Sequence, residues 1–145
     1  MAGLDWLTAQ PVAHRGLHEN AAGVIENTAS AFRAAVEGGF SIETDIQITA
    51  DGEAMVHHDF ALGRLTLGSR QLAAMTAAGL KEVPFKDTAD RMMTLGELCD
   101  FVGGRVPLVI ELKSRFDGNL ALATRAADFG DQMLRLPAGA RGGRG

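Results

Sequence analysis

The sequence predicts an α/β domain with a parallel sheet. Short apolar segments alternate along the chain with segments whose apolar residues recur at helical spacing. The segment 106–112 is almost continuously apolar, as expected for a strand that is buried on both faces. A β-α-β order with buried strands is typical of an α/β fold. With 145 residues, the chain has a length that suits one domain.

Four strands and four helices are expected, each bounded by a turn or capping signal. The expected strands are 11–14, 40–49, 54–58 and 106–112, and the expected helices are 29–37, 69–78, 94–102 and 119–129. Asn27 and Thr28 resemble a helix N-cap, and Thr94 with Glu97 forms a capping box. Asp51-Gly52 is a tight-turn signal between the second and third strands.

Composition and charge exclude several classes of protein. Acidic residues number 18 against 14 basic ones, a net charge of −4, which gives no support for nucleic-acid binding. The single cysteine, Cys99, excludes an intramolecular disulfide and a cysteine-based metal cluster. No segment approaches the roughly 18 apolar residues of a membrane span. Residues 1–10 do not resemble a signal peptide, so we expect a cytoplasmic location.

Charged and histidine residues gather inside the expected strands or just after them. Such residues are costly in a core strand unless they are paired or bind a metal. Four strands share this feature, which favours one common site over four separate coincidences. The residues concerned are His14, Arg15, Glu43, Asp45, His57, His58, Asp59, Glu111 and Lys113.

Three carboxylates in this set predict a site for a hard divalent cation. Glu43 and Asp45 are two residues apart, so both point to one face of a strand. They repel each other unless a cation lies between them, and Glu111 would complete an oxygen-rich site. Three carboxylates without thiolates suit Mg²⁺ or Ca²⁺. Arg15 and Lys113 could neutralise an anionic substrate, and the histidines could transfer protons in phosphoryl transfer.

Taken singly, these motifs also have ordinary structural explanations. His14-Arg15-Gly16 is compatible with a simple turn at a strand end, and Glu43-x-Asp45 with a solvated edge strand. Adjacent histidines on a strand point to opposite faces, so at most one of the pair enters the site. This parity does not choose between His57 and His58.

Five motifs in a fixed order identify the sequence as similar to a known family. They are Ala13-His14-Arg15-Gly16, Glu26-Asn27-Thr28, Glu43-Thr44-Asp45, His58-Asp59 and Glu111-Leu112-Lys113. This order resembles that of the glycerophosphodiester phosphodiesterase family, over about residues 9–128. Members of that family are (β/α)8 TIM barrels that use a divalent cation. They hydrolyse glycerophosphodiesters, a class of small molecule, to glycerol 3-phosphate and an alcohol.

The resemblance implies a role for each motif residue. It implies His14 and His58 as the acid/base pair, Glu43, Asp45 and Glu111 as metal ligands, and Arg15, Lys113 and Glu26 as substrate-binding residues. Because the family motif is His followed by Asp, the resemblance selects His58 and leaves His57 a structural role. Asp59 would orient the local turn. The stretch 60–93 corresponds to an insertion that lies over the site and contacts the glycerol part.

A complete (β/α)8 barrel needs about 250 residues, so the resemblance covers a part of one. We expect the first four β/α units over residues 1–128 and a disordered Gly/Arg-rich tail over 129–145. The open barrel edges would favour self-association. Three alternatives remain: a truncated, non-catalytic remnant of the family, another phosphodiesterase of the same superfamily, and a metal- or anion-binding module without chemistry, which would not need both His14 and His58.

Overall fold

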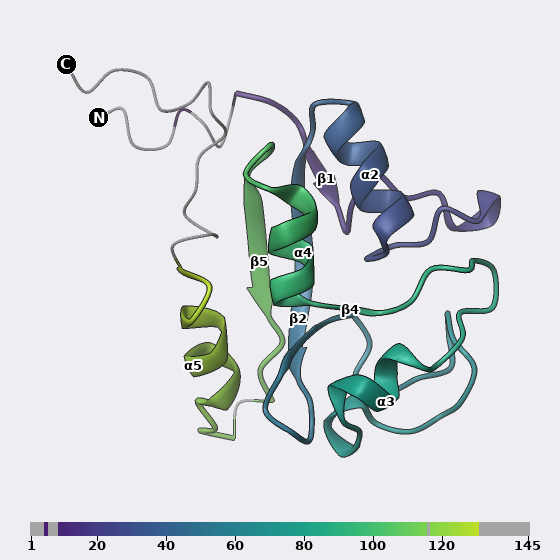
Figure 1. The fold of residues 1–145 in the computed structure, drawn as a ribbon, viewed down its shortest axis with the longest axis vertical. Coiled ribbons are helices and arrows are strands. Elements are labelled where there is room, and N and C mark those ends of the chain that lie inside the picture. Colours follow the sequence, from purple (N-terminus) through teal and green to yellow (C-terminus); the bar gives the residue numbers. More distant parts are fainter. Residues whose placement is uncertain (1–4, 6–8, 116, 131–145) are drawn as a thin grey trace.

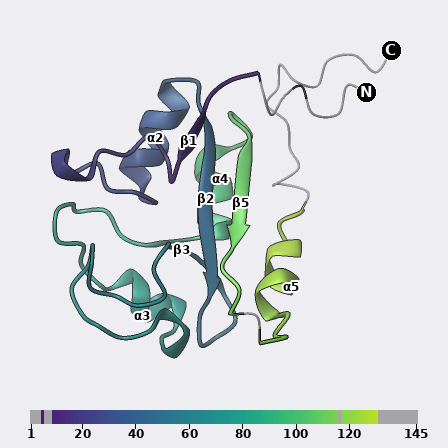
Figure 2. The same ribbon diagram turned by 180° about the vertical axis from the view of Figure 1, so that it is seen from behind.

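The computed structural model describes residue 5, residues 9–115 and residues 117–130. Its strands are Val12–His14 (β1), Ser41–Ile48 (β2), Ala54–Val56 (β3), Met93–Thr94 (β4) and Leu108–Leu112 (β5). Its helices are Ala29–Glu37 (α2), Ala77–Lys81 (α3), Leu95–Val102 (α4) and Ala121–Ala127 (α5), with 3-10 turns at Asn20–Ala22 (η1) and Leu72–Ala74 (η2). Helices α2 and α4 cover one face of the sheet, and α5 lies beside β5 (Figures 1 and 2).

Strand β2 is the centre of a parallel sheet, with β1 along one edge and β5 along the other. In the first pairing Val12 lies opposite Ser41, and in the second Ile42 lies opposite Leu108. The three strands therefore begin at one end of the molecule and finish at the other. This arrangement confirms the predicted α/β class with parallel strands.

The third expected strand runs in the opposite direction. β3 pairs with β2 antiparallel, with Ile46 opposite Val56, and β4 extends it as a further antiparallel strand. The physical reason lies in the connection, because a parallel neighbour needs a crossover of a dozen or more residues. Here Thr49 and Gly52 close a tight turn instead, with the Gly52 amide donating to the Thr49 carbonyl at 3.1 Å. The described sheet thus holds three parallel strands rather than the expected four.

The main core lies between the sheet and its helices. Ile42 and Ile46 of β2 are fully buried there, together with Phe32 of α2 and Leu95 and Leu98 of α4. Even-numbered residues of β2 therefore face the helices. Because side chains alternate along a strand, the odd-numbered residues face the other side of the sheet. This parity directs the acidic residues of β2 away from the main core.

The two predicted helix caps have different outcomes. At α4 the capping box is present: Thr94 accepts from the Glu97 amide at 3.2 Å, and the Glu97 carboxylate accepts from the Thr94 amide at 3.1 Å. At α2 the side chain of Thr28 does not cap the helix. Asp90, 60 residues away in sequence, accepts from the Ser30 amide at 3.0 Å instead. Local sequence cannot indicate such a long-range cap.

The long segment between β3 and β4 packs as a second, smaller core. The helix expected at 69–78 is wrong, because this stretch contains the turn η2 and only the beginning of α3. Leu72 and Leu80 are both fully buried in this second cluster. Backbone hydrogen bonds with distant loop residues, such as Leu72 to the Phe60 carbonyl at 2.9 Å, take the place of helical ones. Tertiary packing therefore overrides the local helical pattern.

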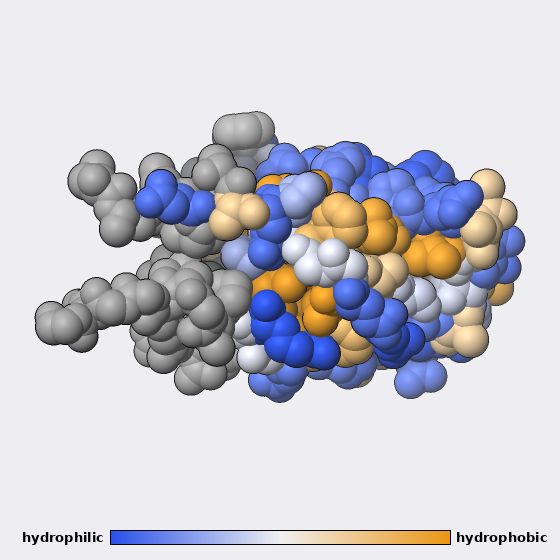
Figure 3. Space-filling model, turned by 90° about the horizontal axis from the view of Figure 1, so that it is seen from above, coloured by the Kyte–Doolittle hydropathy of each residue, from blue (hydrophilic) through white to orange (hydrophobic). Residues whose placement is uncertain are grey.

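One end of the molecule shows apolar surface. Seen from the end at which the parallel strands begin, apolar residues gather between hydrophilic ones (Figure 3). The charged strand ends lie at the opposite end.

Residues 131–145 of the tail predicted over 129–145 lie outside the described residues. Within the described part of the chain, no helix is long and apolar enough to cross a membrane.

Candidate active site

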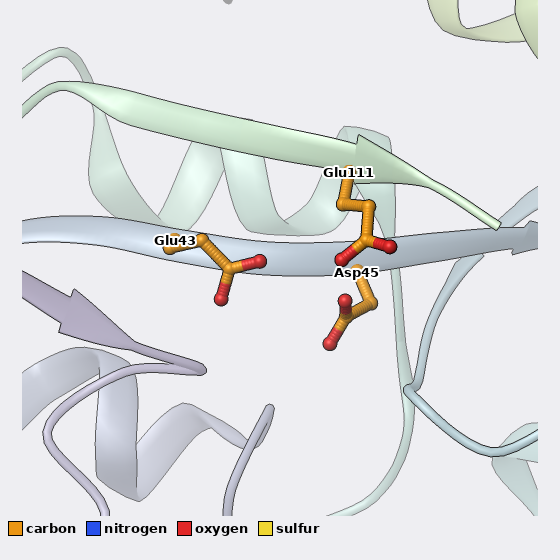
Figure 4. A group of neighbouring side chains, drawn as sticks. All are labelled: Glu43, Asp45 and Glu111. Carbon is orange, nitrogen blue, oxygen red and sulfur yellow. The ribbon is translucent and has the colours of Figure 1, made fainter.

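Three carboxylates converge along the middle of β2, beside the ends of β1 and β5. Asp45 lies directly opposite Glu111 across the two parallel strands, and Glu43 precedes Asp45 by two residues on the same face. One carboxylate oxygen of each residue lies within 4.8 Å of the others. All three side chains project from the sheet into the same space (Figure 4). The structure therefore brings together the predicted metal-ligand set, whose oxygen donors suit a hard cation.

The carboxylates lie in unequal surroundings. Asp45 is 1% exposed, Glu43 is half-buried and Glu111 is exposed. Burial, with the nearby Asp45 carboxylate, raises the pKa of Glu43 above its ordinary value. A hydrogen bond with Lys113 lowers the pKa of Glu111. The crowding of buried negative charge is the condition that a bound cation would relieve.

Two basic side chains flank the acidic group. Lys113 Nζ lies 3.2 Å from Glu111 Oε1 and 3.7 Å from Asp45 Oδ1. Arg15 Nε lies 3.6 Å from Asp45 Oδ2 on the other side. This nitrogen is buried and finds no hydrogen-bond partner among the described residues. Its contact with Asp45 is therefore an ion pair at longer than hydrogen-bond distance.

The turn after β1 brings His14 and Arg15 to the same place. His14 is the register partner of Glu43, and its Nε2 lies 3.6 Å from Glu43 Oε2. The backbone of Arg15 has a φ of 57°, and its amide donates to Glu43 Oε2 at 3.2 Å. Gly16 follows with a φ of 79°, and a Cβ there would lie 2.9 Å from Ala31 of α2. Only glycine fits this close approach between the turn and the helix.

The loop after β3 carries the second candidate histidine. His58 Nδ1 lies 2.8 Å from Asp59 Oδ1. Beneath this loop, the buried amide of Gln47 donates to the carbonyls of His57 and Asp59 at 2.9 and 2.7 Å. Strand β2 therefore fixes the backbone on both sides of His58.

His57 occupies a different environment from its neighbour. It is 3% exposed, and its ring meets that of Phe85 edge-on at a centroid distance of 6.3 Å. Burial lowers the pKa of His57 to about 4, so this imidazole is neutral near pH 7. The His58 side chain is instead 31% exposed. The two rings thus lie in different surroundings, although the strand predicted over 54–58 ends at Val56 and both histidines follow it in the loop.

Glu26, which the resemblance implies as a substrate-binding residue at the mouth of the site, is buried instead. Its side chain is 3% exposed, and its carboxylate accepts hydrogen bonds from Asn20, Arg15 and Arg64. Burial by itself would raise the pKa of Glu26, but these hydrogen bonds lower it to about 2. Both of its oxygens are thus engaged by protein groups in this structure.

Three residues of the site were absent from the sequence-based set. Asn27, interpreted as part of a helix cap, has a φ of 57° and directs its amide to Asp45 at 3.1 Å. Gln47 is two residues beyond Asp45 on β2, so strand alternation places its side chain on the same face as Glu43 and Asp45. That spacing could have identified Gln47 from the sequence. Arg64 reaches Glu26 and Asp59 from the segment between β3 and α3. Its contacts depend on the fold of that segment, and no local pattern indicates them.

A pocket of about 250 Å³ opens beside the acidic group. Lys113 and Gln47 line it on the side of the strands, and Phe60, Leu112 and Leu120 supply apolar surface. Arg115 also lines this pocket and lies over the Phe60 ring, with 4.5 Å between its guanidinium carbon and the ring centroid. The pocket therefore combines a cationic edge with apolar walls.

Comparison with known proteins identifies relatives of this chain. A model of the glycerophosphoryl diester phosphodiesterase family matches residues 14–120. A glycerophosphodiester phosphodiesterase from Caldanaerobacter subterraneus is 37% identical over 111 residues, which is 71% of this chain and 44% of the relative. The chain therefore spans less than half the length of that relative.

Solved structures agree on the fold. A glycerophosphodiester phosphodiesterase from Thermotoga maritima is similar with a TM-score of 0.71 and 29% identity, over 88% of this chain and 52% of that one. An Oleispira antarctica phosphodiesterase, solved in complex with sn-glycerol-3-phosphate, gives a TM-score of 0.75 at 23% identity, over 89% and 53%. The described residues correspond to about half of these TIM-barrel structures.

Proposed function

The chain belongs to the glycerophosphoryl diester phosphodiesterase family, and we propose that it carries the metal-binding and acid–base part of a site that hydrolyses glycerophosphodiesters. The products are glycerol 3-phosphate and an alcohol. The observation that carries this proposal is the convergence of Glu43, Asp45 and Glu111 within 4.8 Å, beside the carboxyl ends of β1 and β5. Barrel enzymes place their chemistry at that end of the sheet.

The three carboxylates would hold a divalent cation, with Mg²⁺ and Ca²⁺ both compatible with the ligand set. When bound there, the cation supplies positive charge that stabilises the phosphoryl oxygens in the transition state. Arg15 and Lys113 bind the anionic phosphate from either side of the carboxylates. The Nε donor of Arg15 supports this assignment, since it is buried beside Asp45 and makes no hydrogen bond among the described residues.

His14 and His58 form the proposed acid/base pair. One imidazole accepts the proton of the attacking hydroxyl, which belongs to water or to the glycerol of the substrate. The other donates a proton to the alcohol oxygen as its bond to phosphorus breaks. The exposure of both rings supports this role, since the His14 side chain is 67% exposed and that of His58 is 31% exposed. His57, buried and neutral near pH 7, keeps the proposed structural role.

The pocket beside Lys113 fits the organic part of the substrate. Its apolar walls include Phe60, from the segment 60–93 that the family resemblance implies to contact the glycerol part. Glu26, proposed from its motif as a substrate-binding residue, is buried against two arginines. Its direct partners in the structure are protein groups, so its contribution to substrate binding acts through Arg15.

Metal titration followed by a hydrolysis assay tests the proposal. Calorimetric titration with Mg²⁺ and with Ca²⁺ should show one binding site per chain, and either ion should raise the melting temperature above that in EDTA. Glycerophosphocholine and glycerophosphoethanolamine then serve as substrate probes, with release of glycerol 3-phosphate as the readout. Metal binding without hydrolysis would support a non-catalytic remnant, and absence of metal binding would overturn the proposal.

A matched pair of variants isolates the carboxylate cluster. Asp45→Asn should abolish the rise in melting temperature with metal, because it removes the buried ligand charge. Glu37→Gln removes one negative charge from the exposed end of α2. It should leave the metal response unchanged. Equal responses from the two variants would show that the cation binds elsewhere.

A further inference from the structure

Arg64 links two acidic residues that lie far apart in sequence. Its Nη1 and Nη2 donate to the two oxygens of Glu26, both at 2.9 Å. Its Nε donates to Asp59 Oδ2 at 2.8 Å, and Nη2 lies 3.3 Å from Asp59 Oδ1. The guanidinium therefore uses its rigid fork of donors on both carboxylates at once.

Asp59 is held so that it can only accept hydrogen bonds. The hydrogen bonds from Arg64, together with that from His58, lower the pKa of Asp59 to about 2 although burial opposes the shift. An ionised carboxylate has no proton to donate. The 2.8 Å contact between Asp59 Oδ1 and His58 Nδ1 therefore requires the proton on Nδ1. In the neutral imidazole, Nε2 is then the nitrogen with the free lone pair.

We propose that Arg64 is a positioning residue that sets the tautomer and orientation of His58 through Asp59. The inference rests on the proposed role of His58 as an acid or base. With the proton fixed on Nδ1, Nε2 is the atom that takes a proton from a reacting group or returns it. Without Arg64, Asp59 loses the contacts that hold its carboxylate against the ring.

Glu26 serves as the anchor of this arrangement. The Asn20 side chain holds it at two points: Nδ2 donates to Glu26 Oε1 at 3.1 Å, and Oδ1 accepts from the Glu26 amide at 2.9 Å. The same carboxylate accepts from Arg15 Nη1 at 2.7 Å. One buried glutamate therefore ties the arginine proposed to bind phosphate to the arginine that positions His58. Arg64 itself is 45% exposed, so its fixed geometry comes from these contacts rather than from burial.

Nitrogen-15 NMR of the histidine rings, on the metal-free chain above the histidine titration range, tests the inference. In the unsubstituted chain, the His58 signals, assigned by their loss in His58→Asn, should show a single neutral tautomer protonated on Nδ1. Arg64→Gln should replace it with a mixture of the two tautomers. Arg64→Lys keeps the charge without the forked donors and should give an intermediate population.

Arg70→Gln is the matched control. Arg70 lies on the same segment, is exposed and donates to the Ala74 carbonyl at 3.1 Å. Its replacement removes the same charge and should leave the His58 tautomer unchanged. An Nε2-protonated ring in the unsubstituted chain would overturn the inference, as would a tautomer that survives Arg64→Gln.

If Arg64→Gln does not fold, Arg64→Lys takes its place as the test variant, and an unchanged tautomer in that variant would overturn the inference. The measurement needs neither cation nor substrate. Absence of metal binding or hydrolysis would thus overturn the proposed function, whereas the positioning of His58 by Arg64 depends only on the ring spectrum.

Discussion

The side-chain amide of Asn27 donates a hydrogen bond to the buried carboxylate of Asp45 at 3.1 Å. Its carbonyl oxygen accepts from the Thr44 hydroxyl at 2.7 Å. Thr44 of β2 therefore orients the Asn27 side chain, and Asn27 in turn orients Asp45, the next residue of the strand. Groups that hydrogen-bond to metal ligands contribute strongly to metal affinity. This relationship supports a prediction about a residue that the sequence alone did not assign to the site.

Asn27→Ala should weaken binding of Mg²⁺ or Ca²⁺ by about ten- to hundred-fold. The remaining carboxylate of Asp45 would lose the group that fixes its orientation. Calorimetric titration measures the change. Thr49→Ala is a suitable control, because it also removes a hydrogen bond from a buried side chain, that of Thr49 to Asp51 at 2.6 Å. Equal metal affinities in the two variants would contradict the prediction.

Glu26 should contribute to stability in a defined range of pH. Its pKa is about 2 in the folded protein against an ordinary value of 4.5, so the unfolded chain binds the proton more readily. Its contribution is complete above pH 4.5 and is lost as the pH falls towards 2. The loss amounts to up to about 3 kcal/mol.

Urea unfolding across that window should therefore show a steep fall in the free energy of unfolding. Glu26→Gln should make the fall shallower, because one of the groups that titrate in this window is gone, whereas Asp59, whose pKa is also about 2, remains. Glu37→Gln, at an exposed position, should preserve it. If the free energy of unfolding of Glu26→Gln falls with pH as steeply as that of the unsubstituted protein, Glu26 is not a source of the acid sensitivity.

Gln47→Leu should destabilise the protein by about 2 kcal/mol or more. The variant keeps a side chain of similar size but leaves the carbonyls of His57 and Asp59 without their donor. Thermal unfolding measures the loss. Gln71→Leu removes an exposed amide that accepts from Arg115 at 2.7 Å, and it should stay within about 0.5 kcal/mol of the unsubstituted chain. Similar losses for both variants would refute the proposed support of the His58 loop.

Gly16→Ala should cost more stability than Gly52→Ala. Both glycines have positive φ, 79° and 78°, so each alanine meets a similar backbone penalty of about 1–2 kcal/mol. The difference lies in space: a Cβ at Gly16 would lie 2.9 Å from Ala31, whereas nothing lies within 4 Å of one at Gly52. The gap between the two melting temperatures therefore measures the contact between the β1 turn and α2. Equal melting temperatures would show that α2 makes room for the added Cβ without loss of stability.

The sequence alone determined the fold class and the residues that the strand ends bring together. Short apolar segments predicted β1 and β2, a continuously apolar segment predicted β5, and the two-residue spacing of Glu43 and Asp45 placed both on one face. These predictions succeed because they depend on local sequence pattern. The capping box at Thr94 is present for the same reason, since its partners are three residues apart.

Tertiary structure decided the features that depend on contacts distant in sequence. The tight turn at Gly52 makes β3 antiparallel, and packing around Leu72 replaces the helix expected at 69–78. The register of β5 against β2, which sets Glu111 opposite Asp45, is fixed by pairing between strands rather than by either strand alone. Arg64 joins Glu26 across 38 residues of chain. A local pattern carries no information about such a pair, because the hydrogen bonds exist only after the intervening segment has folded over the sheet.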